Sequence, residues 1–143
     1  MRLKHSWRLA AIAVCMGLWA CKAAQAEPFK LRCEVEGKFP EASMKVQPAR
    51  VTVELQAIGR HLYFTVIGPT YYEMRVSTLV TDDYLGENLT SGSQVGARRQ
   101  EKRTQRETEI LIERGSMELN AHHDVVQAGK TVRFKYAGKC RLA

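Results

Sequence analysis

The chain has 143 residues, with 22 basic and 15 acidic side chains and therefore a formal net charge of +7. The first 26 residues hold no acidic side chain but four basic ones, Arg2, Lys4, Arg8 and Lys22. Residues 27–143 therefore carry 18 basic and 15 acidic side chains, a net charge of only +3. A charge of this size fits ordinary solubility, so we expect no nucleic-acid partner.

Residues 1–26 have the layout of a cleaved secretion signal. Basic residues precede an apolar run from Leu9 to Ala20, about twelve residues long, whereas a membrane span needs roughly twenty. A small-x-small cleavage site, Ala24-Gln25-Ala26, follows. We predict that residues 27–143 form one domain without a transmembrane segment, in the periplasm of a Gram-negative bacterium or secreted from it. The alternative is a lipoprotein anchored at Cys21, which directly follows the apolar run and Ala20.

The alternation of apolar and polar residues in the exported part is typical of β-strands. Near its start, Phe29, Leu31, Cys33 and Val35 alternate with charged residues. Residues 51–67 predict a hairpin that turns at Gly59-Arg60, where a leading glycine suits a type II′ turn. In the expected register Ile58 faces His61, Leu55 faces Phe64 and Val53 faces Val66, so apolar side chains meet on one face.

The remaining segments follow in chain order. Residues 71–80 form a strand with Tyr72, Met74, Val76 and Val80 toward the core, and residues 82–96 form a surface loop or a weak strand pair. Residues 110–114 pair with residues 117–121 through Gly115-Ser116, so that Ile112 faces Leu119 and Ile110 faces Ala121. In the last segment Val132, Phe134 and Tyr136 point inward. No amphipathic helix is indicated.

Cys33 and Cys140 are the only cysteines in residues 27–143, and each shares the parity of the apolar face of its own segment. In an exported protein this pattern predicts a disulfide that links the first strand to the last. The fold class that we expect is all-β, a small antiparallel barrel or a sandwich. If the first and last strands pair as in a barrel, we expect a sheet with no free edge.

Catalytic and metal-binding patterns are sparse. The chain has no Gly-x-Ser-x-Gly, Walker, HExxH or CxxC pattern. Titratable groups of catalytic type cluster only at His122-His123-Asp124, and adjacent residues on a strand point to opposite faces. We therefore predict no catalytic residue, no metal and no cofactor. The alternative is a small hydrolase or metal-dependent enzyme centred on His122, His123 and Asp124.

The densest positive charge lies between residues 98 and 106, where five basic residues accompany one acid. They are the tentative binding residues of the sequence: Arg98, Arg99, Lys102, Arg103 and Arg106. Such a run suits a periplasmic protein, a glycan or another anionic ligand. The competing interpretation is that the run is the solvated outer part of a long strand leading into Ile110.

The segments Leu31-Arg32-Cys33, Ile110 to Gly115 and Tyr136 to Cys140 resemble a type of small exported β protein of Gram-negative bacteria that is mostly uncharacterised. The overall plan is also similar to the barrel inhibitors of C-type lysozyme. Those proteins use a Ser-Gly-x-x-Tyr loop, whereas this chain has Ser91-Gly92-Ser93-Gln94-Val95, with valine in place of the tyrosine. The resemblance implies inhibition of a cell-wall hydrolase as an alternative function, without assigning inhibitory residues.

The function that we predict is therefore a non-catalytic binding or interaction domain. Its compartment can be tested first. We expect the intact mass of the exported protein to correspond to a chain that begins at Glu27 and carries no lipid. A diacylated mass beginning at Cys21 would instead establish the lipoprotein alternative.

Overall fold

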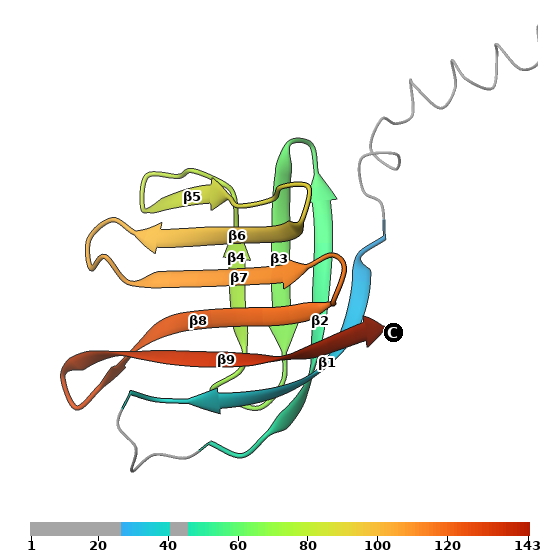
Figure 1. The fold of residues 1–143 in the computed structure, drawn as a ribbon. Coiled ribbons are helices and arrows are strands. Elements are labelled where there is room, and N and C mark those ends of the chain that lie inside the picture. Colours follow the sequence, from blue (N-terminus) through green and yellow to red (C-terminus); the bar gives the residue numbers. More distant parts are fainter. Residues whose placement is uncertain (1–26, 41–45) are drawn as a thin grey trace, which may run out of the picture.

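The computed structural model describes residues 27–40 and 46–143, which form one antiparallel sheet (Figure 1). The predicted signal peptide and Cys21 lie outside the described residues. The strands are β1 Phe29–Lys38, β2 Ala49–Ile58, β3 His61–Ile67, β4 Met74–Ser77, β5 Tyr84–Asn88, β6 Gln94–Glu101, β7 Glu107–Glu113, β8 Glu118–Gln127 and β9 Lys130–Leu142. Within these residues no helix has the length and apolar character needed to cross a membrane.

The order of strands across the sheet is β4-β3-β2-β1-β9-β8-β7-β6-β5. The sheet curls so that β2, β3 and β4 lie behind β5 to β8 in Figure 1, and β4 comes close to β5, β6 and β7. The predicted all-β fold is confirmed, and of its two forms the structure adopts a nearly closed barrel. First and last strands pair over eight residue pairs, from Leu31 opposite Leu142 to Lys38 opposite Lys135.

The expectation of a sheet without a free edge is wrong. Although β1 and β9 pair, they lie in the middle of the sheet, and its edges are the consecutive strands β4 and β5. After β4 the chain crosses over β5, where the backbone of Thr78 and Leu79 lies so close to Gly86 that a β-carbon there would clash. The two edges lie close to each other but are not paired.

The hairpin of β2 and β3 confirms the predicted register at every pair, from Ile58 opposite His61 to Val53 opposite Val66. Gly59 has φ +61°, and Arg60 is not among the residues with positive φ, as a type II′ turn requires. The register of β7 and β8 is also confirmed, with Ile112 opposite Leu119. Their turn is wider than predicted, because Met117 adopts φ +59° and its N–H donates to Glu113 O.

Three details of the strand predictions need correction. The strand expected over residues 71–80 is limited to Met74–Ser77, and Val80 is 60% exposed because the chain has already left the barrel wall. Phe29 is 50% exposed at the end of β1, beyond the point where β9 covers it. Residues 82–96 form the strand pair of β5 and β6, which was one of the two predicted alternatives.

The core fills the inside of the barrel with the inward-facing residues of all strands except β5. Its aromatic centre is a set of rings in edge and tilted contact, Phe39, Tyr72, Phe134 and Tyr136. The Tyr72 hydroxyl donates to Gln47 O at 2.7 Å and accepts from Gly37 N at 3.0 Å, which satisfies a polar group that burial would otherwise penalise. These contacts join β1, β9 and the segment before β4.

The predicted disulfide between Cys33 and Cys140 is confirmed. The two residues are direct cross-strand partners of β1 and β9, and their exposed fractions are 1% and 6%. The bond therefore fixes the one pairing that joins the beginning of the described chain to its end.

Removing this bond should destabilise the domain strongly. The cysteines are 107 positions apart, and closing so long a loop limits the unfolded chain. We expect Cys33→Ala/Cys140→Ala to lower the free energy of unfolding by about 3 to 5 kcal/mol. Urea unfolding with and without reductant measures it: reductant should destabilise the wild type and leave the variant unchanged. Equal midpoints in all four measurements would contradict the expectation.

Candidate functional site

The outer face of β2, β1 and β9 carries a cluster of basic side chains in two adjacent cross-strand rows. In the first row Arg32 stands between Thr52 and Arg141. In the second row Glu34 stands between Arg50 and Lys139. All of these residues alternate with inward-facing core residues such as Cys33 and Val51, so the period of the strands directs them outward.

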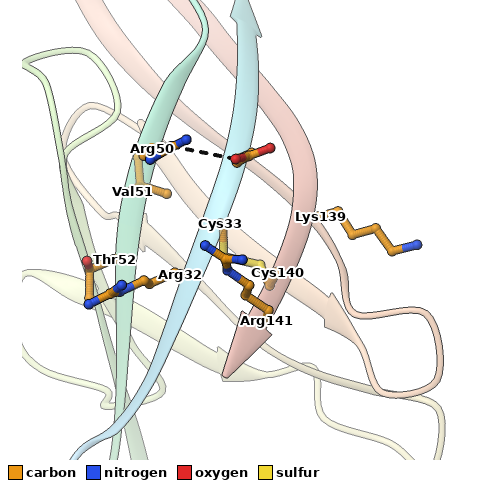
Figure 2. A pocket seen from close by; sticks show the side chains of 9 residues that line it. Arg32, Cys33, Arg50, Val51, Thr52, Lys139, Cys140 and Arg141 are labelled. Atoms are coloured by element: carbon orange, nitrogen blue, oxygen red, sulfur yellow. Dashed lines mark ion pairs between the residues drawn. A yellow bond between two sulfur atoms is a disulfide. The ribbon is translucent and has the colours of Figure 1, made fainter. Parts of the chain in front are cut away.

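The two rows border a groove of about 530 Å³, shown in Figure 2. We call it the basic groove; its lining residues are Arg32, Cys33, Glu34, Arg50, Val51, Thr52, Lys139, Cys140 and Arg141. In this view the Arg32 side chain extends across β2 to the side of Thr52, the Arg141 guanidinium lies beside Cys33, and the Lys139 side chain extends away from both. The groove thus presents four cations and one carboxylate.

The single carboxylate neutralises only one of these cations. Glu34 pairs with Arg50 at 3.5 Å, and both side chains are largely exposed. Among residues 27–40 and 46–143, no acidic side chain forms an ion pair with Arg32, Lys139 or Arg141. Like charges that face each other directly on paired strands destabilise the sheet. An anion between Arg32 and Arg141 would remove that repulsion.

The groove lies on a rigid part of the barrel. β1 is paired on both sides, with β2 and with β9. The disulfide joins β1 to β9 at the residue pair that lies between the two rows. A binding surface on fixed strands needs little ordering when a ligand arrives, which favours affinity.

The predicted binding residues between 98 and 106 do not form one surface. The run straddles a hairpin: β6 ends at Glu101 and β7 begins at Glu107. The interpretation of the run as one long strand is therefore wrong. Arg98 and Arg99 point to opposite faces of β6, while Lys102 and Arg103 lie exposed in the turn.

Two of the five basic side chains in that run are neutralised by acids. The Arg98 guanidinium donates to Glu109 Oε1 at 2.6 Å and to Glu87 Oε2 at 3.2 Å, and the hydrogen bond to Glu109 raises the pKa of Arg98. Arg106 pairs with Glu101 at 3.0 Å. A third, Arg99, lies 4.5 Å from the centre of the Tyr84 ring. The charge density of the sequence therefore overstates the charge available to a partner here.

His123 is separated from its two neighbours as predicted, whereas His122 and Asp124 share the outer face of β8, where both contact Glu107. His122 faces outward, where Nε2 lies 2.8 Å from Glu107 Oε1 and Nδ1 lies 3.6 Å from Glu109 Oε2. His123 faces inward, and its Nε2 lies 2.6 Å from Tyr71 O. The two imidazoles thus occupy different environments on opposite faces of β8, and each has a partner.

Asp124 holds the ends of two neighbouring strands together. It accepts hydrogen bonds from Glu107 N at 2.9 Å and from Arg133 Nε at 2.9 Å. Burial opposes ionisation of this carboxyl, but the bonds from Arg133 and Glu107 outweigh it and hold the pKa of Asp124 below its ordinary value. Within the described part of the chain, no group of three or more His, Cys, Asp or Glu residues has the geometry of a metal site.

The segment Ser91 to Val95 forms the turn between β5 and β6 and enters β6. Ser91 N donates to Gln94 O at 2.9 Å, and the serine hydroxyls of Ser91 and Ser93 lie 3.2 Å apart. This turn is next to the β5 edge of the sheet, whereas the basic groove is in its middle. The two features are therefore separate surfaces.

Comparison of the chain with protein families, with curated proteins and with solved structures finds no match.

Sequence reasoning missed the basic groove, although part of it was accessible. A cross-strand disulfide between antiparallel strands sets Cys33 opposite Cys140, and this register places Arg32 opposite Arg141 and Glu34 opposite Lys139. Because successive side chains of a strand point to opposite faces, all four side chains lie on the outer face. The contribution of Arg50 and Thr52 required the register of β1 with β2, which the sequence did not indicate.

The hydrogen bonds of Asp124 predict a pH-dependent contribution to stability. Because its pKa in the folded protein is below the ordinary 3.8, the carboxylate stabilises the fold above that pH. The contribution is lost as pH falls through the folded-state pKa. We expect Asp124→Asn to cost about 1 kcal/mol at pH 7, a low figure because solvent screens the partly exposed Arg133.

Denaturant unfolding at pH 7 and at pH 3 measures this effect. The difference between wild type and Asp124→Asn should shrink toward acid pH, because below 3.8 the carboxyl group of the unfolded chain binds a proton that folding must release. Asp82→Asn is the matched control, since Asp82 lies exposed between β4 and β5. A constant difference at both pH values would contradict the role assigned to the carboxylate.

Proposed function

We propose that the protein is a non-catalytic binding domain of the periplasm or the extracellular space, and that the basic groove holds an anionic partner. One observation carries the proposal: Arg32 and Arg141 stand directly opposite each other on the outer face of β1 and β9. No described acidic side chain forms an ion pair with either of them.

The chemistry of the groove favours carboxylate or phosphate groups. A guanidinium offers a planar set of five N–H donors that matches either group in a bidentate manner. Two such groups from facing residues, with Lys139 and Arg50 in the next row, suit a partner that presents at least two acidic groups. Strand geometry separates the rows by about 7 Å, so neighbouring acidic groups on one partner could engage both rows.

The proposal that the domain is non-catalytic has separate support. The groove contains no histidine, and its cysteines are joined in the disulfide. Its carboxylate, Glu34, is paired with Arg50 and largely exposed. A general base needs a group within reach of the substrate and a pKa tuned by its surroundings. The groove supplies positive charge and shape, which suffice for binding.

The export proposal has its support in the first 26 residues and in the buried disulfide. A disulfide of this kind persists in oxidising compartments and is rare in the cytoplasm. The acidic partner is therefore expected outside the cytoplasm, where anionic glycans and acidic proteins are exposed.

Binding to a labelled poly-L-glutamate probe and to polyphosphate tests the proposal. Arg32→Gln/Arg141→Gln should weaken binding of at least one probe about tenfold, equivalent to about 1.4 kcal/mol. Lys102→Gln/Arg103→Gln removes the same charge from an exposed turn and should change affinity less than about twofold. Binding by the wild type should weaken as salt rises, because exposed charges are screened over about 8 Å at physiological ionic strength.

The thermal unfolding temperature of the same variants shows whether a loss of affinity results from unfolding of the domain. The groove variant should be at least as stable as the wild type, since it removes a repulsion between facing cations. Equal losses of affinity in both double variants would mean that the probe responds to the net charge of the protein and not to the groove. A loss of affinity in Lys102→Gln/Arg103→Gln alone would place the binding surface on residues 98–106. Either result contradicts the proposed groove.

A further inference from the structure

A second hollow, of about 300 Å³, lies where β4 faces β5 to β8 across the opening of the barrel. It shares no lining residue with the basic groove. Its centre is a cross-strand row on the inner face, in which Arg99 is opposite Thr108 and Thr108 is opposite His123. Arg75 and Tyr84 complete the part of the lining that concerns a ligand.

Arg99 is an inward-facing cation without an acidic partner among the described residues. Ala97, two positions earlier on β6, is fully buried, so strand alternation directs Arg99 toward the same side. Its guanidinium carbon lies 4.5 Å from the centre of the Tyr84 ring. Stacking on a ring face stabilises the cation and leaves the N–H groups at the edge of the guanidinium for hydrogen bonds.

The acidic residues around the hollow are largely engaged elsewhere. Glu101 pairs with Arg106 at 3.0 Å, and Asp124 pairs with Arg133 at 2.9 Å. Glu73 is the remaining carboxylate, against the two cations Arg75 and Arg99. Glu101 is thus neutralised by Arg106 within the hollow, and Asp124 by Arg133 outside it, which leaves an excess of one positive charge that one carboxylate group of a ligand would neutralise.

Thr108 and His123 add hydrogen-bonding capacity beside Arg99. His123 Nε2 lies 2.6 Å from the Tyr71 carbonyl oxygen, which only accepts, so Nε2 carries the proton. Burial lowers the pKa of His123 and favours the neutral ring, in which Nδ1 is an acceptor. The threonine hydroxyl both donates and accepts. Such groups suit hydroxyl groups of a ligand as well as a carboxylate.

We infer that this hollow binds a small hydroxy carboxylic acid, such as a sugar acid, with its carboxylate on the Arg99 guanidinium and a hydroxyl group on Thr108. The volume is at the lower end of the range for small-molecule sites, which begins at about 300 Å³. A single monosaccharide acid fits within this volume. The site is independent of the basic groove, so either can fail while the other stands.

Titration with D-glucuronate, followed by NMR chemical shifts and calorimetry, tests the site, with D-glucose as the uncharged analogue. The wild type should bind glucuronate and not glucose. Arg99→Gln should weaken binding at least about tenfold, whereas Arg103→Gln, an equal change of charge in the exposed turn, should leave affinity within about twofold. Arg32→Gln/Arg141→Gln should also bind glucuronate normally, because its substitutions lie in the groove.

Two further variants keep the test decisive if Arg99→Gln fails to fold. Arg99→Lys retains the charge but loses the planar set of donors, and should bind glucuronate less tightly than the wild type. Thr108→Val retains the shape and removes the hydroxyl, and should weaken glucuronate binding with little effect on acetate. The inference is overturned if the wild type shows no glucuronate-dependent shifts at Thr108 and His123, if glucose gives the same shifts, or if Arg103→Gln weakens binding as much as the Arg99 variants.

Discussion

The pairing of β1 with β9 is the interaction on which the rest of this barrel depends. Every other ladder in the described sheet joins strands that are neighbours in the sequence, so each of those ladders can form locally. The pairing of β1 with β9 alone joins the meander of β1 to β4 to the meander of β5 to β9. Forming it requires a long loop to close, and the disulfide between Cys33 and Cys140 retains that closure once it is made. The basic groove lies on this seam.

The sequence predicts those parts of the fold whose causes are local. The register of β2 with β3 follows from Gly59 and from alternation on both sides of it, and every predicted pair is present. The disulfide between Cys33 and Cys140 could be predicted from the expectation of export and from the position of both residues on the apolar faces of their strands. The edges at β4 and β5, and the exposure of Val80, depend on where the two ends of a curled sheet meet. That relation involves the whole barrel, and no short window of sequence contains it.

The candidate sites show the same division between local and long-range causes. A run of basic residues is visible in the sequence, but the acids that neutralise Arg98 come from β5 and β7. Alternation then sends Arg98 to the outer face and Arg99 to the inner face, and separates His122 from His123 in the same way. Adjacent residues of one type therefore have different environments and different proposed roles. The sequence shows how many charged residues a segment holds. The pairing of the strands determines which of these side chains are accessible to a ligand.

The position of the sheet opening has a consequence for the connectivity of the chain. Ala143 N donates to Lys30 O at 3.2 Å, so the last described residue lies beside the start of β1, while β4 and β5 are joined by the residues that cross the opening. A circular permutant that links residue 143 to the start of β1 and begins at β5 would visit the strands in the order in which they lie across the sheet. The long-range seam would become one more hairpin, and the ends of the permuted chain would lie at the two edges of the sheet, β5 and β4. The strand order of the described barrel is thus that of a simple meander in which the first strand, β1, and the last, β9, meet at the centre.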